Sequence, residues 1–378
     1  MLKRQCNQVC FSASWTSSKN TLTSIPLKCE MRELQIINSF YSNGFFDLKD
    51  FILTGQIENV SYFCLLKLLK KVPIKQILRY SNLDTRITQI VSKYADELEK
   101  RVINVAILVG AVAQTDLIKN PRAASPLFYL MNQNTATQNI ISPKRTKSAT
   151  NSIKQTDYTH IFRHLSITEC CLFQNIACIR ETLEIVQRGF DKSLAEINFG
   201  QCLLAVNCKQ FSNFINSNNI TKLEINDCTI KDPQLISDHF FQSNQQLKEF
   251  NLENCKEVFD NLTDDTLHNW SVNESWPVKL LLSNVSSKIT YKGISRLMDA
   301  FHSLNFFQFN MQNEKESSIE KKLFWDFGSI NCRMDQLLDT FECYNKYIKY
   351  IHKSSNTVAF IYTFTNVTLN IVWKVTLP

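Results

Sequence analysis

Cysteine is the residue whose type and spacing in this chain could most readily do chemistry. Thirteen cysteines are present among 378 residues. A thiolate is a nucleophile and a ligand for soft metal ions, whereas a buried thiol acts as a small apolar group and a weak hydrogen-bond donor. Four of them recur at similar intervals in the middle of the chain: Cys170, Cys202, Cys228 and Cys255.

A zinc site is one interpretation of the first of these cysteines, because His160 and His164 precede Cys170 and Cys171. Two histidines four residues apart converge on a metal when they lie on one helix. The pattern around His164 predicts a strand instead, and the chain has no Cys-x-x-Cys pair nearby. We therefore predict no metal site. The seven glycines never cluster into a phosphate-binding loop, and we predict no cofactor.

The sequence has no pattern typical of an enzyme. It lacks a Gly-x-Ser-x-Gly elbow, a His-Glu-x-x-His motif and a Walker-type loop. Cys208 beside Lys209 is the nearest approach to an activated thiol, and a thiol on a helix face explains it better. The neighbouring carboxylates Asp264 and Asp265 lie in a polar connection and are typical of solvated loop charge. We therefore predict that the chain is not an enzyme.

Each recurrent cysteine stands at the ninth place of a segment with one spacing: apolar, two residues, apolar, one, apolar, two, Cys. The segments begin at Phe162, Leu194, Ile220 and Leu247, which lie 32, 26 and 27 residues apart. Each period holds a short strand and room for one helix. One such unit cannot bury its own apolar side, so the spacing predicts a stack of units.

This spacing resembles that of the leucine-rich repeat superfamily, which has Leu at the apolar places and Asn or Cys at the ninth. With Cys at all four ninth places, the chain is similar to the cysteine-containing and ribonuclease-inhibitor-like branch. The resemblance implies an α/β fold, a leucine-rich repeat solenoid with a curved parallel sheet and helices on its convex side. It also implies a structural ladder of Cys170, Cys202, Cys228 and Cys255 beneath the strand ends.

The repeat pattern divides the chain into five regions. They are a polar N-terminal tail (1–30), degenerate N-terminal repeats (31–113), a polar insertion (114–157), leucine-rich repeats (158–315), and a C-terminal helix and hairpin cap (316–378). The weaker units begin at Leu48, at Ile74 and at Val102 (followed by Val105 and Ile107) upstream. Downstream they comprise Leu280, Leu282 and Val285, then Leu304, Phe307 and Phe309.

Helix and strand signals accompany these units. Asp232 and Pro233 predict the start of a helix over 233–242, and the apolar residues from Ile294 to Phe301 recur at helical spacing. Residues 334–351 are helix-like. Apolar residues then alternate over 358–364 and 367–377, which predicts a hairpin. It would cap the stack or, alternatively, serve as a dimerisation strand.

The tail and the insertion carry few acidic residues. None precedes Glu30, which fits a disordered tail or, alternatively, a mitochondrial presequence. Ser142 precedes Pro143 and two cations, so it is either a possible phosphosite or part of an ordinary solvated loop. Reduced thiols without a secretory leader predict a cytoplasmic protein, with mitochondrion and nucleus as alternatives. No apolar stretch is long enough to span a bilayer, so we expect no membrane contact.

Charge and the strand pattern together indicate the kind of partner. A net charge of +7 is small and scattered, and we expect no nucleic acid. Residues between the buried strand positions should form columns on the concave face. The candidate partner-binding residues are Glu169, Asn198, Gln201, Glu224, Asn226, Asp227, Asn251, Glu253 and Asn254. This polar, locally acidic face suits a protein offering Lys and Arg, although a solvated strand surface without a partner would also be polar.

We therefore expect a non-enzymatic protein–protein interaction module that binds a protein partner through its concave strand face. One alternative is a structural subunit of a large assembly. A second follows from the resemblance, because cysteine-containing members often act as substrate-recognition parts of ubiquitin ligases. An N-terminal F-box joins such members to the ligase, and residues 1–30 are too short and polar to form one.

Overall fold

The protein is described from a computed structural model. It covers residues 48–53, 55–80, 83–110, 127–132, 135–141, 162–311, 321–332, 336, 341–344, 346–353, 357–364 and 367–376. The chain divides into two compact units, Met1–Val91 and Ser92–Pro378, hereafter unit 1 and unit 2. The predicted tail (1–30) and the candidate phosphosite Ser142 lie outside the described residues.

Unit 1 is helical throughout its described part. Its elements are α2 (Leu48–Leu53), the 3₁₀ helix η1 (Gln56–Asn59), α3 (Tyr62–Leu69), α4 (Ile74–Tyr80) and α5 (Thr85–Lys93), which runs to the start of unit 2. The Arg86 guanidinium in α5 donates to the backbone carbonyls of Ile57, at 2.9 Å, and Val60. These two bonds tie α5 to η1 and to the residue that follows it.

The interpretation of residues 31–113 as degenerate strand repeats is wrong for this helical part. Leu48 and Phe51 lie in α2, and Ile74 and Ile77 lie in α4. Each pair is three residues apart, a spacing that places two side chains on one face of a helix as readily as it fits the repeat. Residues 31–47 lie outside the described residues.

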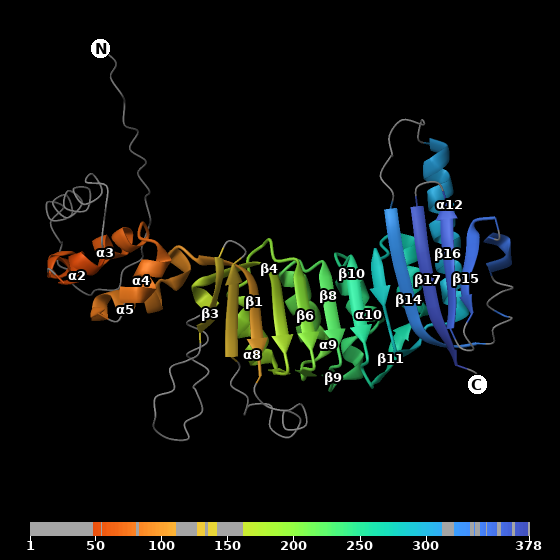
Figure 1. The fold of residues 1–378 in the computed structure, drawn as a ribbon, viewed down its shortest axis with the longest axis horizontal. Coiled ribbons are helices and arrows are strands. Elements are labelled where there is room, and N and C mark those ends of the chain that lie inside the picture. Colours follow the sequence, from red (N-terminus) through yellow and green to blue (C-terminus); the bar gives the residue numbers. More distant parts are fainter. Residues whose placement is uncertain are drawn as a thin grey trace, which may run out of the picture. The chain divides into compact units, whose positions relative to one another are not determined.

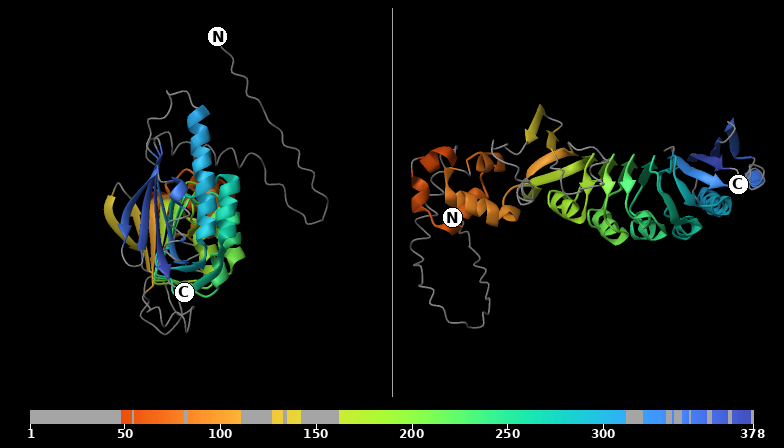
Figure 2. Two further views of the ribbon diagram at one scale, coloured as in Figure 1. Left: turned by 90° about the vertical axis from the view of Figure 1, so that its right-hand side faces the viewer. Right: turned by 90° about the horizontal axis from the view of Figure 1, so that it is seen from below.

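Unit 2 is an α/β structure with a mostly parallel sheet of many strands and its helices on one side (Figures 1 and 2). The strands follow one another in the order β15-β16-β17-β14-β12-β10-β8-β6-β4-β1-β2-β3. Neighbours from β1 through β14 to β17 are parallel, and antiparallel pairs lie at both ends. The predicted α/β class is confirmed at this level.

The strands of the main sheet have the following bounds: β1 (Arg101–Val109), β2 (Leu127–Asn132), β3 (Thr135–Ile141), β4 (Leu165–Gln174), β6 (Glu196–Gly200), β8 (Lys222–Asn226), β10 (Glu249–Glu253), β12 (Lys279–Leu281), β14 (Lys321–Asn331), β15 (Ile348–Lys353), β16 (Thr357–Phe364) and β17 (Val367–Thr376). Shorter strands follow the turns: β5 (Ala177–Cys178), β7 (Leu203–Leu204), β9 (Thr229–Ile230), β11 (Val258–Thr263) and β13 (Ser286–Lys288). The helices are η3 (Ala95–Glu97), α8 (Arg180–Gln187), α9 (Cys208–Ser217), η4 (Pro233–Leu235), α10 (Asp238–Ser243), α11 (Asp264–Asn273), α12 (Tyr291–Met311) and η5 (Glu342–Tyr344).

One arrangement recurs through the middle of unit 2: a strand, a turn, a short second strand and a helix. Inward-pointing side chains of successive strands lie side by side, because Ile197 pairs with Leu223 and Leu223 with Phe250. In the short strands Leu204 pairs with Ile230. The segments beginning at Leu194, Ile220 and Leu247 therefore share the frame that their spacing predicts.

The first segment has a different frame from the one predicted at Phe162. Cys171 pairs with Ile197, and Phe173 with Phe199. The matching unit therefore starts at Thr168, 26 residues before Leu194. The error arose because apolar residues alternate upstream as well, where β4 extends along β1, so the template fits six residues too early. The places of the template are Thr168, Cys171, Phe173, Ile176 and Cys178.

Three of the predicted ladder thiols occupy equivalent places. The Sγ atoms of Cys202 and Cys228 each donate to a carbonyl of the preceding strand, Phe173 O at 3.3 Å and Phe199 O at 3.4 Å. The Sγ of Cys255 lies 4.0 Å from Ile225 O in the same way. These thiols satisfy carbonyls at the strand ends and so join neighbouring units.

Cys170 does not belong to this ladder, and its prediction is wrong. It pairs with Glu196 across the sheet and is half-exposed, on the side of the sheet opposite the helices. Burial, together with the adjacent Glu196 carboxylate, raises the pKa of its thiol to about 12. Ile176 takes the place assigned to Cys170, and it is buried.

The ladder thiols should resist alkylation in the folded protein. Burial raises the pKa of Cys202, and that of Cys255 to about 12. Hydrogen bonding to Cys202 together with burial raises the pKa of Cys228. Because the thiolate is the reactive form, we expect iodoacetamide to label all three at least ~100-fold more slowly in the native protein than in denaturant. Mass spectrometry of each cysteine peptide measures this ratio, and comparable native and denatured rates would contradict the ladder.

Downstream, one predicted unit is confirmed and the next is wrong. Leu280 pairs with Phe250 in register, and Leu282 and Val285 are buried. The unit at Leu304 lies instead within α12, and the next strand is β14, where Trp325 pairs with Leu280. The three-residue step from Leu304 to Phe307 was again ambiguous between a helix and the repeat template.

Helix predictions in this region hold in part. Asp232 caps η4 by accepting from the Gln234 N–H at 3.0 Å, with Pro233 at the first position. The predicted helix over 233–242 is nevertheless divided, because α10 begins after its own cap at Ser237. The stripe from Ile294 to Phe301 lies on α12 and is buried.

The C-terminal alternation forms the predicted hairpin. β16 pairs antiparallel along its full length with Val367–Lys374 of β17, and β17 also pairs parallel with β14. The helix predicted over 334–351 is wrong from Ile348 onward, because Ile348–Lys353 is strand β15. β15 pairs with β16, and this pairing outweighs the local helical preference of the segment.

The strands before β4 differ from prediction in register. In β1 the buried side chains are Ile103, Ala106 and Leu108, whereas Val102 is 56% exposed. The template at Val102 was thus one residue out, which exchanges the two faces of a strand. The predicted polar insertion (114–157) contains strands β2 and β3, which extend the sheet beyond β1.

No helix in the described part of the chain has the length and apolar character needed to cross a bilayer.

Candidate functional site

The most distinctive polar surface of unit 2 lies on the strand face, the side of the sheet opposite the helices. Strands β6, β8 and β10 each show the burial pattern of alternating half-buried and buried residues. The half-buried positions point away from the helices and lie in register. We name these positions the polar band: Glu196, Asn198, Gly200, Lys222, Glu224, Asn226, Glu249, Asn251 and Glu253.

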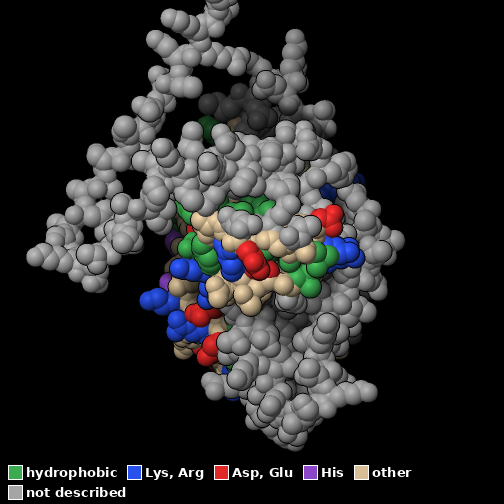
Figure 3. Space-filling model, turned by 90° about the vertical axis from the view of Figure 1, so that its left-hand side faces the viewer, with side chains coloured by type: hydrophobic (Ala, Val, Ile, Leu, Met, Phe, Trp, Pro, Cys, Tyr) green, Lys and Arg blue, Asp and Glu red, His purple; other side chains and the backbone are tan. Residues whose placement is uncertain are grey.

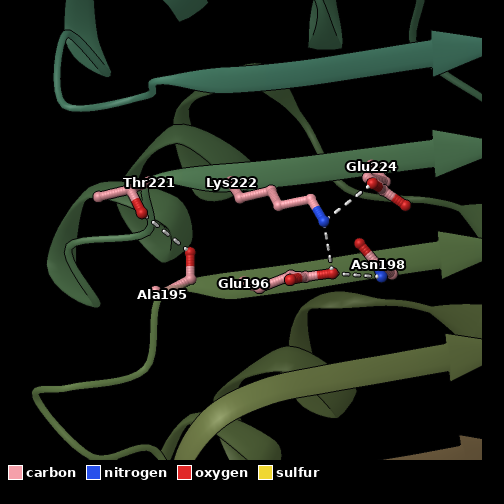
Figure 4. A network of polar contacts seen from close by, with 6 residues as sticks. All are labelled: Ala195, Glu196, Asn198, Thr221, Lys222 and Glu224. Atoms are coloured by element: carbon pink, nitrogen blue, oxygen red, sulfur yellow. Dashed lines mark hydrogen bonds and ion pairs between the residues drawn. The ribbon is translucent and has the colours of Figure 1, made fainter. Parts of the chain in front are cut away.

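A charged network lies at the centre of the polar band (Figure 4). Lys222 Nζ lies 3.0 Å from a Glu196 carboxylate oxygen and 3.2 Å from one of Glu224. Asn198 Nδ2 donates to the same Glu196 oxygen at 2.9 Å. Burial alone would lower the pKa of Lys222, but its hydrogen bonds to both carboxylates outweigh burial and raise that pKa. The lysine therefore stays charged and holds two strands together.

The remaining acidic groups of the band are not neutralised in this way. Glu249 and Glu253 of β10 form no ion pair with the residues that the structure describes. The polar band thus holds four carboxylates and one ammonium group, a formal charge of −3 in a chain whose total is +7. In the end view of Figure 3, by contrast, Lys, Arg, Asp and Glu side chains intermingle on the coloured surface.

Three amides of the band lack hydrogen-bond donors. Asn198 Oδ1, Asn226 Oδ1 and Asn251 Oδ1 are shielded from water and accept no hydrogen bond within the described part of the chain. A buried acceptor without a donor costs about 1–3 kcal/mol. Rotation of these side chains would present the oxygens to a donor from outside. The band therefore offers acceptors and negative charge together.

The structure places five of the nine predicted binding residues in the polar band: Asn198, Glu224, Asn226, Asn251 and Glu253. Three others, Gln201, Asp227 and Asn254, form a separate row in the turns that follow the strands. Each of these three adopts a left-handed backbone, with φ of 52°, 53° and 54°. They mark the edge of the strand face instead of its centre.

This turn row continues through equivalent residues of the neighbouring repeating segments of unit 2. Asn175 and Asn284 have the same left-handed conformation, with φ of 53° and 58°. Asn284 Nδ2 donates to Asn254 Oδ1 at 2.7 Å, so adjacent turns are bonded to each other. Asn tolerates this conformation better than most residues, and the row is therefore explained by turn geometry.

Glu169 was predicted in this row and does not belong to it. Asn175 takes that place because the first unit starts at Thr168. The Glu169 carboxylate is exposed and accepts from Asn104 Nδ2 of β1 at 2.5 Å. Glu169 thus lies in the middle of β4, where the register between β1 and β4 shifts.

Sequence reasoning missed Glu196 and Glu249, which begin the outward-facing positions of β6 and β10. The same two-residue alternation that predicts Asn198 and Asn251 would have included them. It also missed Ile107 and Leu172, two half-buried apolar residues in the same register row as Asn198, Glu224 and Asn251. Leu281 follows in this row, as the strand alternation predicts.

The structure brings together few groups that could do chemistry. No cluster of three His, Cys, Asp or Glu residues suited to a metal ion occurs among the described residues. His164 is buried just before β4, and its proposed zinc partner His160 lies outside the described residues. The polar band presents amide oxygens and carboxylates, which can recognise hydrogen-bond donors and cations.

Comparisons with known proteins give no relatives: no family model, no curated protein and no solved structure matches this chain.

Proposed function

We propose that the chain is a non-enzymatic interaction module that binds a protein partner through its strand face. The observation that carries this proposal is the polar band, with its net negative charge and its unpaired carboxylates and amide oxygens. A strand face that only meets water has no need of acceptors shielded from solvent and left without donors. A partner's N–H groups and cations would satisfy them.

We further propose a leucine-rich repeat solenoid of the cysteine-containing type as the fold. Its support is the recurrence of strand, turn, short strand and helix, the frame shared by Leu194, Ile220 and Leu247, and the thiols of Cys202, Cys228 and Cys255 bonded to preceding strands. In such a fold the strand face is the concave side and presents its side chains in columns. Binding of a protein there is what the resemblance implies.

Charge reversal on β10 tests the proposed function. Glu249→Lys together with Glu253→Lys changes four units of charge at two half-buried positions that take part in no ion pair with described residues. We expect the amount of each specific partner captured from the native cell extract to fall by at least ~10-fold, since like charges across an interface are strongly unfavourable. Quantitative mass spectrometry of captured proteins measures the change.

The matched control is Glu181→Lys together with Glu274→Lys, which makes the same charge change at exposed positions in α8 and after α11. It should leave capture unchanged. Captured partners that respond to neither pair of substitutions would contradict binding through the strand face. That result would favour a structural subunit held in an assembly through other surfaces.

A further inference from the structure

One register row of the strand face changes along its length from apolar to polar side chains and then back to an apolar one. Starting from β1 it reads Ile107, Leu172, Asn198, Glu224, Asn251 and Leu281. All six side chains are half-buried. The polar band is therefore flanked on both sides by aliphatic groups on the same straight line across the strands.

The first flank extends beyond this row. Val105 and Val109 lie on the same face of β1 as Ile107, because they pair with Cys170 and Gln174 of β4. Together with Leu172 they form a group of aliphatic side chains on two adjacent strands. Partly exposed aliphatic side chains grouped in this way are typical of binding surfaces.

The second flank begins at Leu281 of β12. Phe324 of β14 is half-buried on the same face, since it pairs with Lys279, and Val372 of β17 pairs with Asp326. Apolar groups are interleaved here with Lys279 and Asp326. This flank is therefore less uniform than the first, and Leu281 is its member nearest the band.

The separation between the flanks sets the length of a ligand. Leu172 and Leu281 lie on β4 and β12, four strand spacings apart, which corresponds to roughly 19 Å at about 4.8 Å per strand. An α-helix covers that distance in about 13 residues, and an extended chain in about six. A single short polypeptide segment can therefore touch both flanks and the band.

On this basis we propose that the partner segment is a polypeptide with a cationic centre and an apolar anchor at each end, lying across strands β4 to β12. The inference rests on the proposed function and adds the chemistry of the partner. Lys or Arg at the centre would pair with Glu249 and Glu253 and donate to the amide oxygens of the band. The apolar ends would cover Leu172 and Leu281.

The charge of the band also separates this ligand from other classes. Four carboxylates against one ammonium group repel a phosphate backbone, so nucleic acid is disfavoured. An acidic peptide is disfavoured for the same reason. Lys222, the one cation of the band, is already shared between Glu196 and Glu224.

The test is selection of peptides on the full chain. A phage-displayed library of random 16-residue peptides is long enough for either conformation. We expect enriched peptides to carry Lys or Arg in the middle and aliphatic or aromatic residues toward both ends. One enriched peptide is then synthesised with a fluorophore, and its affinity is measured by fluorescence anisotropy.

Three variants of the full chain test which residues of the strand face contact the cationic centre and the apolar ends of the peptide. Glu249→Lys with Glu253→Lys should weaken binding by at least ~10-fold, and this loss should shrink as salt is added. Leu172→Asn and Leu281→Asn should each weaken binding by about 5- to 30-fold, which corresponds to loss of one buried aliphatic group. Because the two sites are far apart, their effects should multiply in the double variant.

The outcomes distinguish the inference from the proposed function. Peptides that depend on these strand-face residues but are neutral, acidic or without apolar ends would overturn the inference and leave strand-face binding intact. Peptides unaffected by every strand-face variant would overturn both. Unchanged circular dichroism of each variant verifies that lost binding does not reflect lost folding.

Discussion

Replacing Phe240 by Ala is expected to lower the free energy of unfolding by about 3–5 kcal/mol. Phe240 is fully buried, and its ring contacts those of Phe211, Phe241 and Phe250, with centroids 5.7, 5.2 and 6.0 Å away. These partners come from the preceding helix, its own helix and the following strand. The substitution would leave a cavity where successive repeating segments of unit 2 pack together, and repacking from one side cannot fill it.

Denaturation followed by circular dichroism measures this loss. The control is Phe306→Ala, which removes the same side chain from α12 where it is 47% exposed, and should cost less than about 1 kcal/mol. If the Ala variant does not fold, Phe240→Leu can be measured in its place. This substitution keeps most of the side-chain volume and should lower the free energy of unfolding by about 1–2 kcal/mol. Equal losses for Phe240→Ala and Phe306→Ala would contradict the importance of this junction.

The repeat pattern predicted the middle of the fold well because three of its features are coupled there. In the segments beginning at Leu194, Ile220 and Leu247, the apolar spacing, the cysteine and the following helix all agree. Each apolar position is buried between the strand and its helix. A frame that satisfies all of these features has no near alternative.

Prediction failed where one feature stood alone. Leu48 with Phe51, and Leu304 with Phe307, have only a three-residue step, which a helix also provides. In β1 both faces carry aliphatic residues, so the strand was found and its register was not. Strands β2, β3 and β15 were not predicted because residues 114–157 were judged by their polar composition and 334–351 by their helical spacing, although β2 pairs with β3 and β15 with β16 across short connections.

The candidate site was predictable to a similar extent. Alternation alone identifies Asn198, Glu224 and Asn251 as outward-facing. The bond from Lys222 to Glu196 joins residues 26 positions apart in neighbouring strands, and it requires the exact register between units. The apolar flank on β1 and β4 was not predicted, because Leu172 was assigned to the core in a frame that starts six residues too early.

The second large effect is expected at Asp238, the first residue of α10. Its carboxylate accepts four hydrogen bonds from the start of the next helix, α11. Oδ1 accepts from Thr263 N at 2.9 Å, Thr266 N at 3.2 Å and Thr266 Oγ1 at 2.5 Å, and Oδ2 accepts from Thr263 Oγ1 at 2.7 Å. One side chain thus accepts from the N–H of the cap residue Thr263 and from that of Thr266, which has no partner within the first turn of α11.

A similar link between helix starts recurs in the next repeating segment of unit 2. Asp264, the first residue of α11, accepts from Thr290 N at 2.7 Å and from Thr290 Oγ1 at 2.6 Å, just before α12. Cys208, the first residue of α9, lies 3.7 Å from the hydroxyl of Ser237, the cap of α10. The first residue of α9, of α10 and of α11 therefore contacts the start of the next helix, on the side of unit 2 opposite the polar band.

Asp238→Ala should consequently destabilise the protein by about 2–4 kcal/mol, since hydrogen bonds to a charged group are worth about 1.5–3 kcal/mol and the buried donors of α11 would lose their partners. Asp238→Asn keeps one acceptor oxygen and should recover about half of that loss. Asp265→Ala removes an exposed carboxylate from the first turn of α11 without touching this link, and should cost less than about 1 kcal/mol. Chemical denaturation of the three variants ranks them. If Asp238→Ala lost no more stability than Asp265→Ala, the helix starts would not be coupled. The repeating segments of unit 2 would then be joined by their strands and core alone.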